Sequence, residues 1–462
     1  MMALLFPSAQ RSITTEAPAA QTLKPNKCLY QYVFATSGYF CLVLIIYSAS
    51  YMSLYNTICV IIVLTAAFGY INHRYIKMPQ TIGIMIMSLV TSLVIIAINW
   101  IYPALFLKPV QIIKSLDFYT LLMKIMLSFL LFAGSLHLDA HRFKKHALSI
   151  FTFSTIGVII STFLVGLLFY FAAGLFNLHI TFIEALLFGA LISPTDPIAV
   201  LGILRQANIP ASLEIKITGE SLFNDGVAIV VFLTIYHIMQ AGTENLSISG
   251  VGLLFLREAC GGVLLGFALG YCGYFVLKSI NNYKTEALIT LAIVMGGYLV
   301  ADRLHVSGPL AMVVAGIITG NKSMRQAMTP TTHDYVGKLW ELIDDVLNAI
   351  LFLLIGLEML VIPFSWFVFC LGLVAILIVL LSRYISVAIP IALLKYRIRL
   401  EKNAAIVLTW GGLRGGISVA LALSLPAGEY NHIFIAVTYM IVLFSIVVQG
   451  LTIGGLVKRT RQ

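Results

Sequence analysis

Charged residues are scarce in this chain: they make up only 10% of its 462 residues, whereas 60% are hydrophobic. A soluble globular protein has about 25% charged and about 45–50% apolar residues. After residue 30, no stretch outside the apolar segments exceeds about twenty residues, so we expect no separate water-soluble domain. The mean hydropathy of +0.99 therefore predicts an integral, multi-pass protein of the lipid bilayer.

Cysteine is also rare. The six cysteines are scattered through apolar stretches without a CxxC pair, which is typical of buried, reduced thiols. The sequence has no nucleophile–base pairing, metal-ligand cluster or phosphate-binding loop, so we expect neither enzyme activity nor a cofactor. The net charge of +10 lies in short basic runs between apolar segments, and such runs indicate cytoplasmic loops rather than nucleic-acid binding.

Apolar windows of about twenty residues predict an all-α fold with thirteen transmembrane helices. Residues 33–51 could add a fourteenth helix. They could instead be a signal peptide that is cleaved, because "YSASY" offers small residues after the apolar run. The length of that run favours a helix, and residues 1–27 are expected to be a polar tail. The thirteen segments are 54–72, 79–101, 117–137, 147–177, 181–206, 214–240, 249–278, 284–303, 306–320, 338–361, 364–395, 402–424 and 430–457.

The distribution of basic residues predicts the orientation of these segments. If the C-terminal "KRTRQ" is cytoplasmic, the loops on its side hold nineteen Lys and Arg, and the opposite loops hold three. Cytoplasmic loops carry an excess of Lys and Arg. We therefore expect a cytoplasmic C-terminus, with 458–462 as a short tail, in the inner (plasma) membrane of a bacterium.

Four charges lie deep inside predicted helices: Asp196, Asp225, Arg383 and Arg414. With a rise of 1.5 Å per residue and a hydrocarbon core about 30 Å thick, each lies about ten to twelve residues from a helix end, near the midplane. Such charges are costly in lipid, so they usually pair with one another or mark an ion path. The common depth predicts a functional site.

The segment "ITGESLFNDGVAIVVF" places Ser221 and Asp225 on one helical face. Na⁺ is a hard cation that takes oxygen ligands, and Thr195 and Asp196 in the preceding segment could complete a set with this pair. A lone Ser or Thr in a membrane helix also commonly bonds its own backbone. The predicted Na⁺ ligands are Asp225, Ser221, Thr195 and Asp196.

Glu220 and Asn224 share the neighbouring face of the same helix. The favoured partner of Glu220 is a midplane arginine, with Arg383 ahead of Arg414. Pairing with Lys216, one turn away, is the alternative.

Two segments contain helix-breaking residues around a charge. "ISPTDPIAV" (192–200) flanks Asp196 with two prolines, and "TWGGLRGGISVAL" (409–421) surrounds Arg414 with four glycines. Interrupted helices in both halves of a chain indicate a transporter of inverted repeats with its site where the breaks meet. The predicted six-helix repeats are 54–240 and 284–457, joined by 249–278, although the glycines could also serve close helix packing alone.

These motifs resemble those of the NhaP/NHE-like cation:proton antiporters. The resemblance rests on "SPTDPIAV", "GESLFNDGVAIVVF", "EALITLAIVMGGYLVADRLHVSGPLAMVVAGIITGN" and "TWGGLRGGISVAL", and it extends over about residues 54–457. It implies thirteen helices, a homodimer, and exchange of one Na⁺ or Li⁺ for one H⁺. It further implies a dimerisation part, about 54–137 and 249–361, and a core ion-translocation part, about 147–240 and 364–457.

The resemblance also implies roles for single residues. Asp225 matches the carboxylate that binds the ion and the proton, and Thr195, Ser221 and Asp196 match its co-ligands. Glu220 matches the partner of an arginine, which Arg383 would supply. Asn224 matches a residue that holds the crossing of the broken helices together. Arg414 is a further supporting residue that the sequence pattern predicts and the resemblance does not assign: among the four glycines, it could face the carbonyl ends of the half-helices.

The expected function is secondary active antiport of Na⁺ (or Li⁺) against H⁺, by alternating access at Asp225, in sodium and pH homeostasis. Desolvation disfavours the charged carboxylate and a bound cation favours it, so proton and cation compete for one group. Exchange of K⁺ for H⁺ stays open from the ligand set. A cation channel is a weaker alternative, because the sequence has no repeated pore loop.

Overall fold

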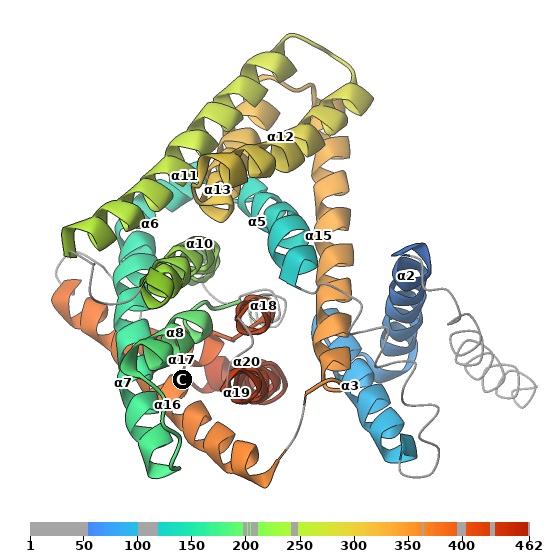
Figure 1. The fold of residues 1–462 in the computed structure, drawn as a ribbon. Helices are drawn as coiled ribbons and strands as arrows, with labels where there is room; N and C mark the ends of the chain where they lie inside the picture. The colour runs from blue at the N-terminus through green and yellow to red at the C-terminus, as the bar shows by residue number, and fades with distance from the viewer. Residues whose placement is uncertain are drawn as a thin grey trace, which may run out of the picture. The chain divides into compact units, whose positions relative to one another are not determined.

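The computed structural model describes residues 54–99, 119–196, 201, 204, 211–241, 248–362, 365–394, 403–425 and 430–460, all within one compact unit, Met52–Gln462. The tail, extra helix or signal expected in residues 1–53 lies outside the described residues. The part of the chain that is described is helical, with one isolated bridge and no strand (Figure 1). The all-α prediction is confirmed.

Seven of the predicted segments form long helices without an internal break. They are α2 (Leu54–Ile71), α3 (Gln80–Asn99), α10 (Ala211–Ala241), α11 (Ile248–Lys278), α12 (Tyr283–Leu304), α15 (Pro330–Glu358) and α16 (Trp366–Leu394).

Other segments contain a turn of π-helix. Such turns join α6 (Ala140–Phe151) to α7 (Val158–Leu175), α13 (Gly308–Ile318) to α14 (Met324–Gln326), and α19 (Asn431–Phe444) to α20 (Gly450–Thr460), and another precedes α5 (Leu127–Leu136). Three short helices, α8 (Phe182–Ile192), α17 (Ala404–Gly411) and α18 (Gly416–Leu423), adjoin the two predicted breaks. π-helical turns often mark functional sites, and the sequence did not predict them.

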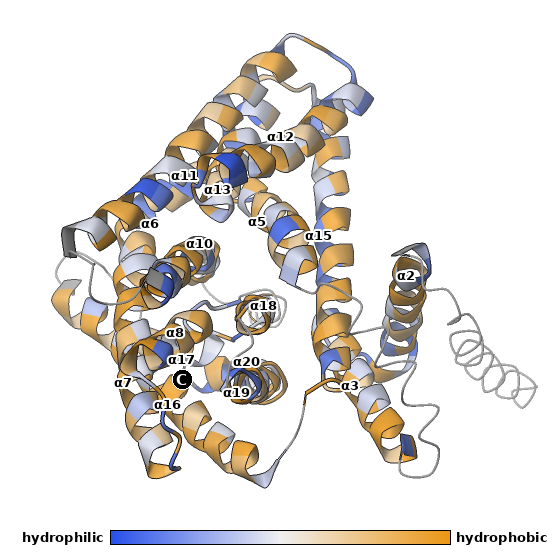
Figure 2. Cartoon of the chain, in the orientation of Figure 1, coloured by the Kyte–Doolittle hydropathy of each residue, from blue (hydrophilic) through white to orange (hydrophobic). Residues whose placement is uncertain are grey.

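Among the described residues, eight helices are long and apolar enough to cross a membrane. The remaining predicted segments correspond to shorter or broken helices, so the count of thirteen spans stays a prediction. Large apolar side chains such as Leu175 (85% exposed), Trp366 (78%) and Leu393 (74%) point outward, and the hydrophobic colour continues over the helices (Figure 2). Apolar outer faces suit contact with lipid chains.

Two helices extend into segments predicted as loops. α6 includes the basic run "HRFKKH" (141–146), because Asp139 caps its N-terminus by accepting hydrogen bonds from the backbone N–H groups of His141 and Arg142. α15 begins at Pro330 after Thr329, whose side chain accepts a bond from the Thr332 N–H. The count of Lys and Arg on each side of the membrane is unaffected, but the starts predicted for these two helices, at 147 and 338, were too late.

The helices pack in two sets. The first set comprises α2, α3, α5, α11, α12, α13 and α15, with α13 against α5 and α11 and α15 against α3. The second set comprises α6, α7, α8, α10 and α16 to α20, with α7 against α8 and α16 against α7 and α19. α10 and α18 contact the first set, so the functional residues lie close to the boundary between the sets.

Candidate functional site

The two broken segments meet in the structure. α8 ends at Ile192 and α17 at Gly411, and the extended residues that follow run antiparallel. The backbone N–H of Asp196 donates a hydrogen bond of 2.7 Å to the carbonyl oxygen of Leu413. Backbone groups freed by proline and glycine therefore satisfy one another away from water, as a membrane interior requires.

Arg414 lies across the end of α8. Its side chain is 2% exposed, and its guanidinium donates to the carbonyl oxygens of Ser193 and, at 3.0 Å, of Pro194. These carbonyls are at the C-terminal, negative end of a helix dipole. The arginine thus neutralises a helix end, which is the type of contact that the sequence predicted for it.

Gly415 lets the two segments approach closely. A Cβ atom at this position would overlap the Asp196 side chain, so a larger residue would separate the segments. The backbone N–H of Arg414 donates to Ser445 Oγ at 2.9 Å, and that hydroxyl donates to Gln449 Oε1 at 2.7 Å. The second break is thereby tied to the π-helical turn between α19 and α20.

A polar cluster joins the first break to α10. Asn224 Nδ2 donates to Thr195 Oγ1 at 2.6 Å, and Asn224 Oδ1 accepts a longer bond, 3.4 Å, from the Thr195 N–H. The hydroxyl oxygens of Thr195 and Ser221 are 3.4 Å apart. All three residues are buried, and two predicted ligand oxygens therefore lie together.

Asp225 is buried, at 7% exposure, and within the described residues its Oδ1 has no hydrogen-bond partner. It lines a cavity of about 660 Å³ together with Asp196. The same cavity is lined by His137 and Arg142, which are exposed at the connection between α5 and α6. A path for water and ions thus leads from that connection to the two aspartates.

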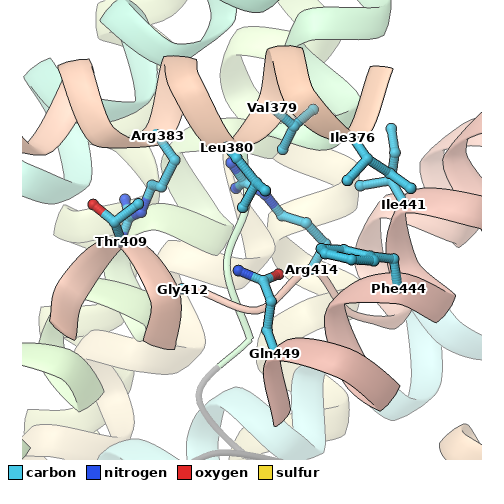
Figure 3. Close-up of a pocket in the computed structure, with 10 residues that line it drawn as sticks. All are labelled: Ile376, Val379, Leu380, Arg383, Thr409, Gly412, Arg414, Ile441, Phe444 and Gln449. Atoms are coloured by element: carbon cyan, nitrogen blue, oxygen red, sulfur yellow. The ribbon is translucent and has the colours of Figure 1, made fainter. Parts of the chain in front are cut away.

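Glu220 pairs with Arg383 of α16, with 2.5 Å between the carboxylate and the guanidinium. Arg383 also donates to the Leu408 carbonyl oxygen at 3.4 Å. Figure 3 shows Arg383 reaching from α16 toward Thr409 on α17, with Arg414 in the same small pocket. The ion pair therefore connects α10 to α16, and the second contact of Arg383 connects α16 to α17.

Several participants were not found from the sequence. The carbonyl oxygens of Ser193 and Pro194 carry no side-chain signal. Ser445 and Gln449, spaced i, i+4 in an apolar segment, were a detectable polar pair. Asp344 and Asp345 on α15 also line the cavity.

The oxygens of Thr195, Ser221 and Asp225 suit a hard monovalent cation better than a transition metal. Over the described part of the chain, no three His, Cys, Asp or Glu residues gather as a metal site. Such a cation would be cargo and not a resident cofactor.

Comparisons with known proteins agree with this arrangement. Residues 61–459 match the family model of the transmembrane sodium/hydrogen exchangers. The Na⁺/H⁺ antiporter NhaP of Pseudomonas aeruginosa is 47% identical over 87% of this chain and 96% of its own length. The Na⁺/H⁺ antiporter NhaH of Halobacillus dabanensis is 33% identical over 84% of this chain and 93% of its own.

The fold is similar to a solved structure. The sodium proton antiporter MjNhaP1 of Methanocaldococcus jannaschii superposes with a TM-score of 0.69 over 88% of this chain and 99% of that one, at 18% identity. At that identity the likeness concerns the fold alone.

Proposed function

The chain belongs to the sodium/hydrogen exchanger family of membrane transporters, and on that premise we propose that it exchanges one Na⁺ (or Li⁺) for one H⁺ at Asp225. It is a Na⁺/H⁺ antiporter and not an enzyme. Both named relatives are Na⁺/H⁺ antiporters, so K⁺/H⁺ exchange is not favoured.

One observation carries the proposal: Asp225 is buried, lines the cavity, and has a carboxylate oxygen without a hydrogen-bond partner in the described structure. Away from water such a group favours its neutral, protonated form, and a bound cation favours the charged form. Binding of one ion therefore expels the other. This competition couples the two fluxes without a second site.

The proposed co-ligands are Thr195, Ser221 and Asp196. Their support is the short distance between the two hydroxyl oxygens and the shared cavity of the two aspartates. Asn224 fixes Thr195 through two hydrogen bonds. Its role would be to hold the ligand oxygens in place, because an amide carries no charge to exchange.

Arg414 and the pair Glu220–Arg383 act as supporting residues in this proposal. Arg414 binds the end of α8, and the ion pair links α10 to α16. Rigid support of this kind keeps ligand oxygens within the narrow range of distances that a small cation requires.

The two helix sets support a mechanism of alternating access. In the proposal the first set corresponds to the dimerisation part, about 54–137 and 249–361, and the second to the core part, about 147–240 and 364–457; the contacts within each set support this division. In the proposal a homodimer forms through the first set, and the second set moves against it to expose Asp225 to each side in turn. Inverted repeats of six helices would give the two exposed states related geometries.

The proposed orientation places the mouth of the cavity in the cytoplasm, at the α5–α6 connection, with the C-terminus on the same side and the protein in a bacterial inner membrane. The basic run in α6, next to that mouth, supports this orientation.

Transport in proteoliposomes tests the proposal. An imposed Na⁺ gradient should generate a pH gradient, and Asp225→Asn should abolish it while the protein still elutes as a folded species. Asp334→Asn is the matched control, since Asp334 is an exposed carboxylate on α15, and it should transport normally. Undiminished coupled exchange by the Asp225→Asn variant would refute the role of Asp225. Repeating the assay with Li⁺ and K⁺ gives the selectivity.

A further inference from the structure

We propose that Asp344 and Asn348 on α15 form a second, weak site for a partly hydrated monovalent cation, between the mouth of the cavity and Asp225. The proposal rests on the function proposed above, because it concerns the approach of the transported ion to that site.

One face of α15 lines the cavity for about three turns. Glu341, Asp344, Asn348 and Leu351 all belong to the cavity wall, and their spacing of three and four residues places them along one side of a helix. The rise of 1.5 Å per residue gives this row a length of about 15 Å. It leads from exposed Glu341 to buried Leu351.

The inner end of this row reaches the crossing of the broken helices. A Cβ atom at Gly416 would overlap the Leu351 side chain, so Leu351 lies directly against the start of α18. Asp196, Gly416 and Leu351 line the same cavity. The polar row therefore ends beside the principal site.

Asn348 is the observation that indicates a ligand. The residue is 3% exposed and lines the cavity, yet its Oδ1 has no hydrogen-bond partner within the described residues. A buried polar atom without a partner is costly. A cation would satisfy it, because an amide oxygen and a carboxylate one turn away are both ligands for a hard cation.

The charge balance of the site favours a cation as well. In the described part of the chain, no Lys, Arg or His nitrogen lies within ion-pair distance of Asp344. Asp345 is adjacent and also lines the cavity. The negative charge of this wall is thus available to an ion that still carries part of its water shell.

The site differs from the principal one in the helix set that carries it. Asp344 and Asn348 belong to α15 of the first set, whereas Asp225 belongs to α10 of the second. An ion held on α15 would transfer to Asp225 only while the two sets are arranged as in this structure. Two oxygen ligands bind weakly enough for release, as conduction through successive sites requires.

Binding of ²²Na⁺ to the purified, full-length protein in detergent tests the proposal. The Asp225→Asn background removes the principal carboxylate, and ionic strength is held constant with N-methylglucamine chloride. We expect Asp225→Asn to retain weak, saturable binding. Adding Asp344→Asn or Asn348→Leu should weaken that binding by about fivefold or more, because the first removes the charge of one ligand and the second removes the oxygen of the other.

Asp345→Asn is the matched control, because it removes the same charge about 100° around the helix. In the same background it should change the affinity by less than about twofold, since its carboxylate lies off the helical face that Asp344 and Asn348 share and is not one of the proposed ligands. An equal loss for Asp345→Asn and Asp344→Asn would overturn the site. Absence of saturable binding in the Asp225→Asn protein would also overturn it. Asn348→Leu, which keeps the branched shape of the side chain and adds no charge, maintains the test if a charge variant fails to fold.

Transport kinetics separate this proposal from the function of Asp225. With Asp225 intact, Asp344→Asn should raise the KM for Na⁺ offered at the cavity mouth and leave kcat unchanged, which is the pattern of lost ground-state binding. Undiminished exchange by Asp225→Asn would refute the principal site, whereas an unchanged KM in Asp344→Asn would refute only the second one.

Discussion

The buried ion pair of Glu220 and Arg383 allows a quantitative test of how the contact between α10 and α16 stabilises the protein. The two charges are 2.5 Å apart, and their side chains are 2% and 7% exposed. Removal of one partner leaves the other charge buried and uncompensated, which typically costs about 3–5 kcal/mol. We therefore expect Glu220→Gln and Arg383→Met each to lower the free energy of unfolding by about that amount.

The double variant distinguishes an ion pair from two independent contacts. When both charges are removed together, neither is left uncompensated, so the combined cost should be well below the sum of the single costs. We expect a coupling free energy of at least about 2 kcal/mol, within the range for residues in one network. Arg383 should still contribute part of its stabilisation when Glu220 is replaced, because it also donates a hydrogen bond to the Leu408 carbonyl oxygen.

Equilibrium unfolding in mixed detergent and SDS micelles measures these free energies. The control is the pair Asp334–Lys338 on α15, which has a similar distance of 2.8 Å but is 60% and 69% exposed. Exposed pairs contribute little, so its double-mutant cycle should show no measurable coupling. Additive effects of the two substitutions at Glu220 and Arg383 would refute the view that burial makes this pair strong.

Three further predictions follow from local geometry. Gly415→Ala forces a Cβ onto the Asp196 side chain, so it should lower the free energy of unfolding by about 1–3 kcal/mol and slow transport. Gly455→Ala is the control: the space around Gly455 is open, so its unfolding free energy should not change. Equal thermal stability of the two variants would contradict this prediction. Asn321→Ala removes three hydrogen bonds: Oδ1 accepts from the Ala140 N–H that begins α6, and Nδ2 donates to the carbonyl oxygens of Leu138 and Ile317. It should lower the unfolding free energy by about 1–3 kcal/mol in the same unfolding assay. The backbone N–H of Arg142 lowers the pKa of the Asp139 carboxyl. The cap therefore stabilises the protein fully above the ordinary carboxyl pKa of about 4, and this stabilisation is lost as the pH falls through the lower pKa of the folded protein. The difference in melting temperature between wild type and Asp139→Ala should shrink below that pH, and a difference that stays constant with pH would exclude the charged cap.

Much of the fold could be predicted from the sequence, because lipid imposes simple rules on composition. An apolar run in a bilayer has to form a helix, since no water satisfies its backbone. The helix starts of α6 and α15 were predicted too late for a related reason: polar first turns satisfy the same backbone bonds outside the hydrocarbon and leave no apolar signal. Capping by Asp139 and Thr329 sets those boundaries.

The site was only partly predictable. Charges at one depth and two sets of helix breakers pointed to Asp196, Asp225 and Arg414 as neighbours. The choice of Arg383 over Arg414 as the partner of Glu220 was open, because a helical pattern gives the depth of a residue but not the rotation of one helix against another. The structure provides that rotation and pairs Glu220 with Arg383.

The sequence by itself determined that this chain crosses the membrane as helices, where two of them break, and which side chains lie near the midplane. These features depend on local composition, spacing and the absence of water in the bilayer. Only the tertiary structure decided that the Asp196 N–H bonds Leu413, that Arg414 covers the end of α8, and that Asp225 and Asn348 line one cavity. Those contacts depend on how helices far apart in the chain pack, and packing is a property of several helices together that no single segment encodes.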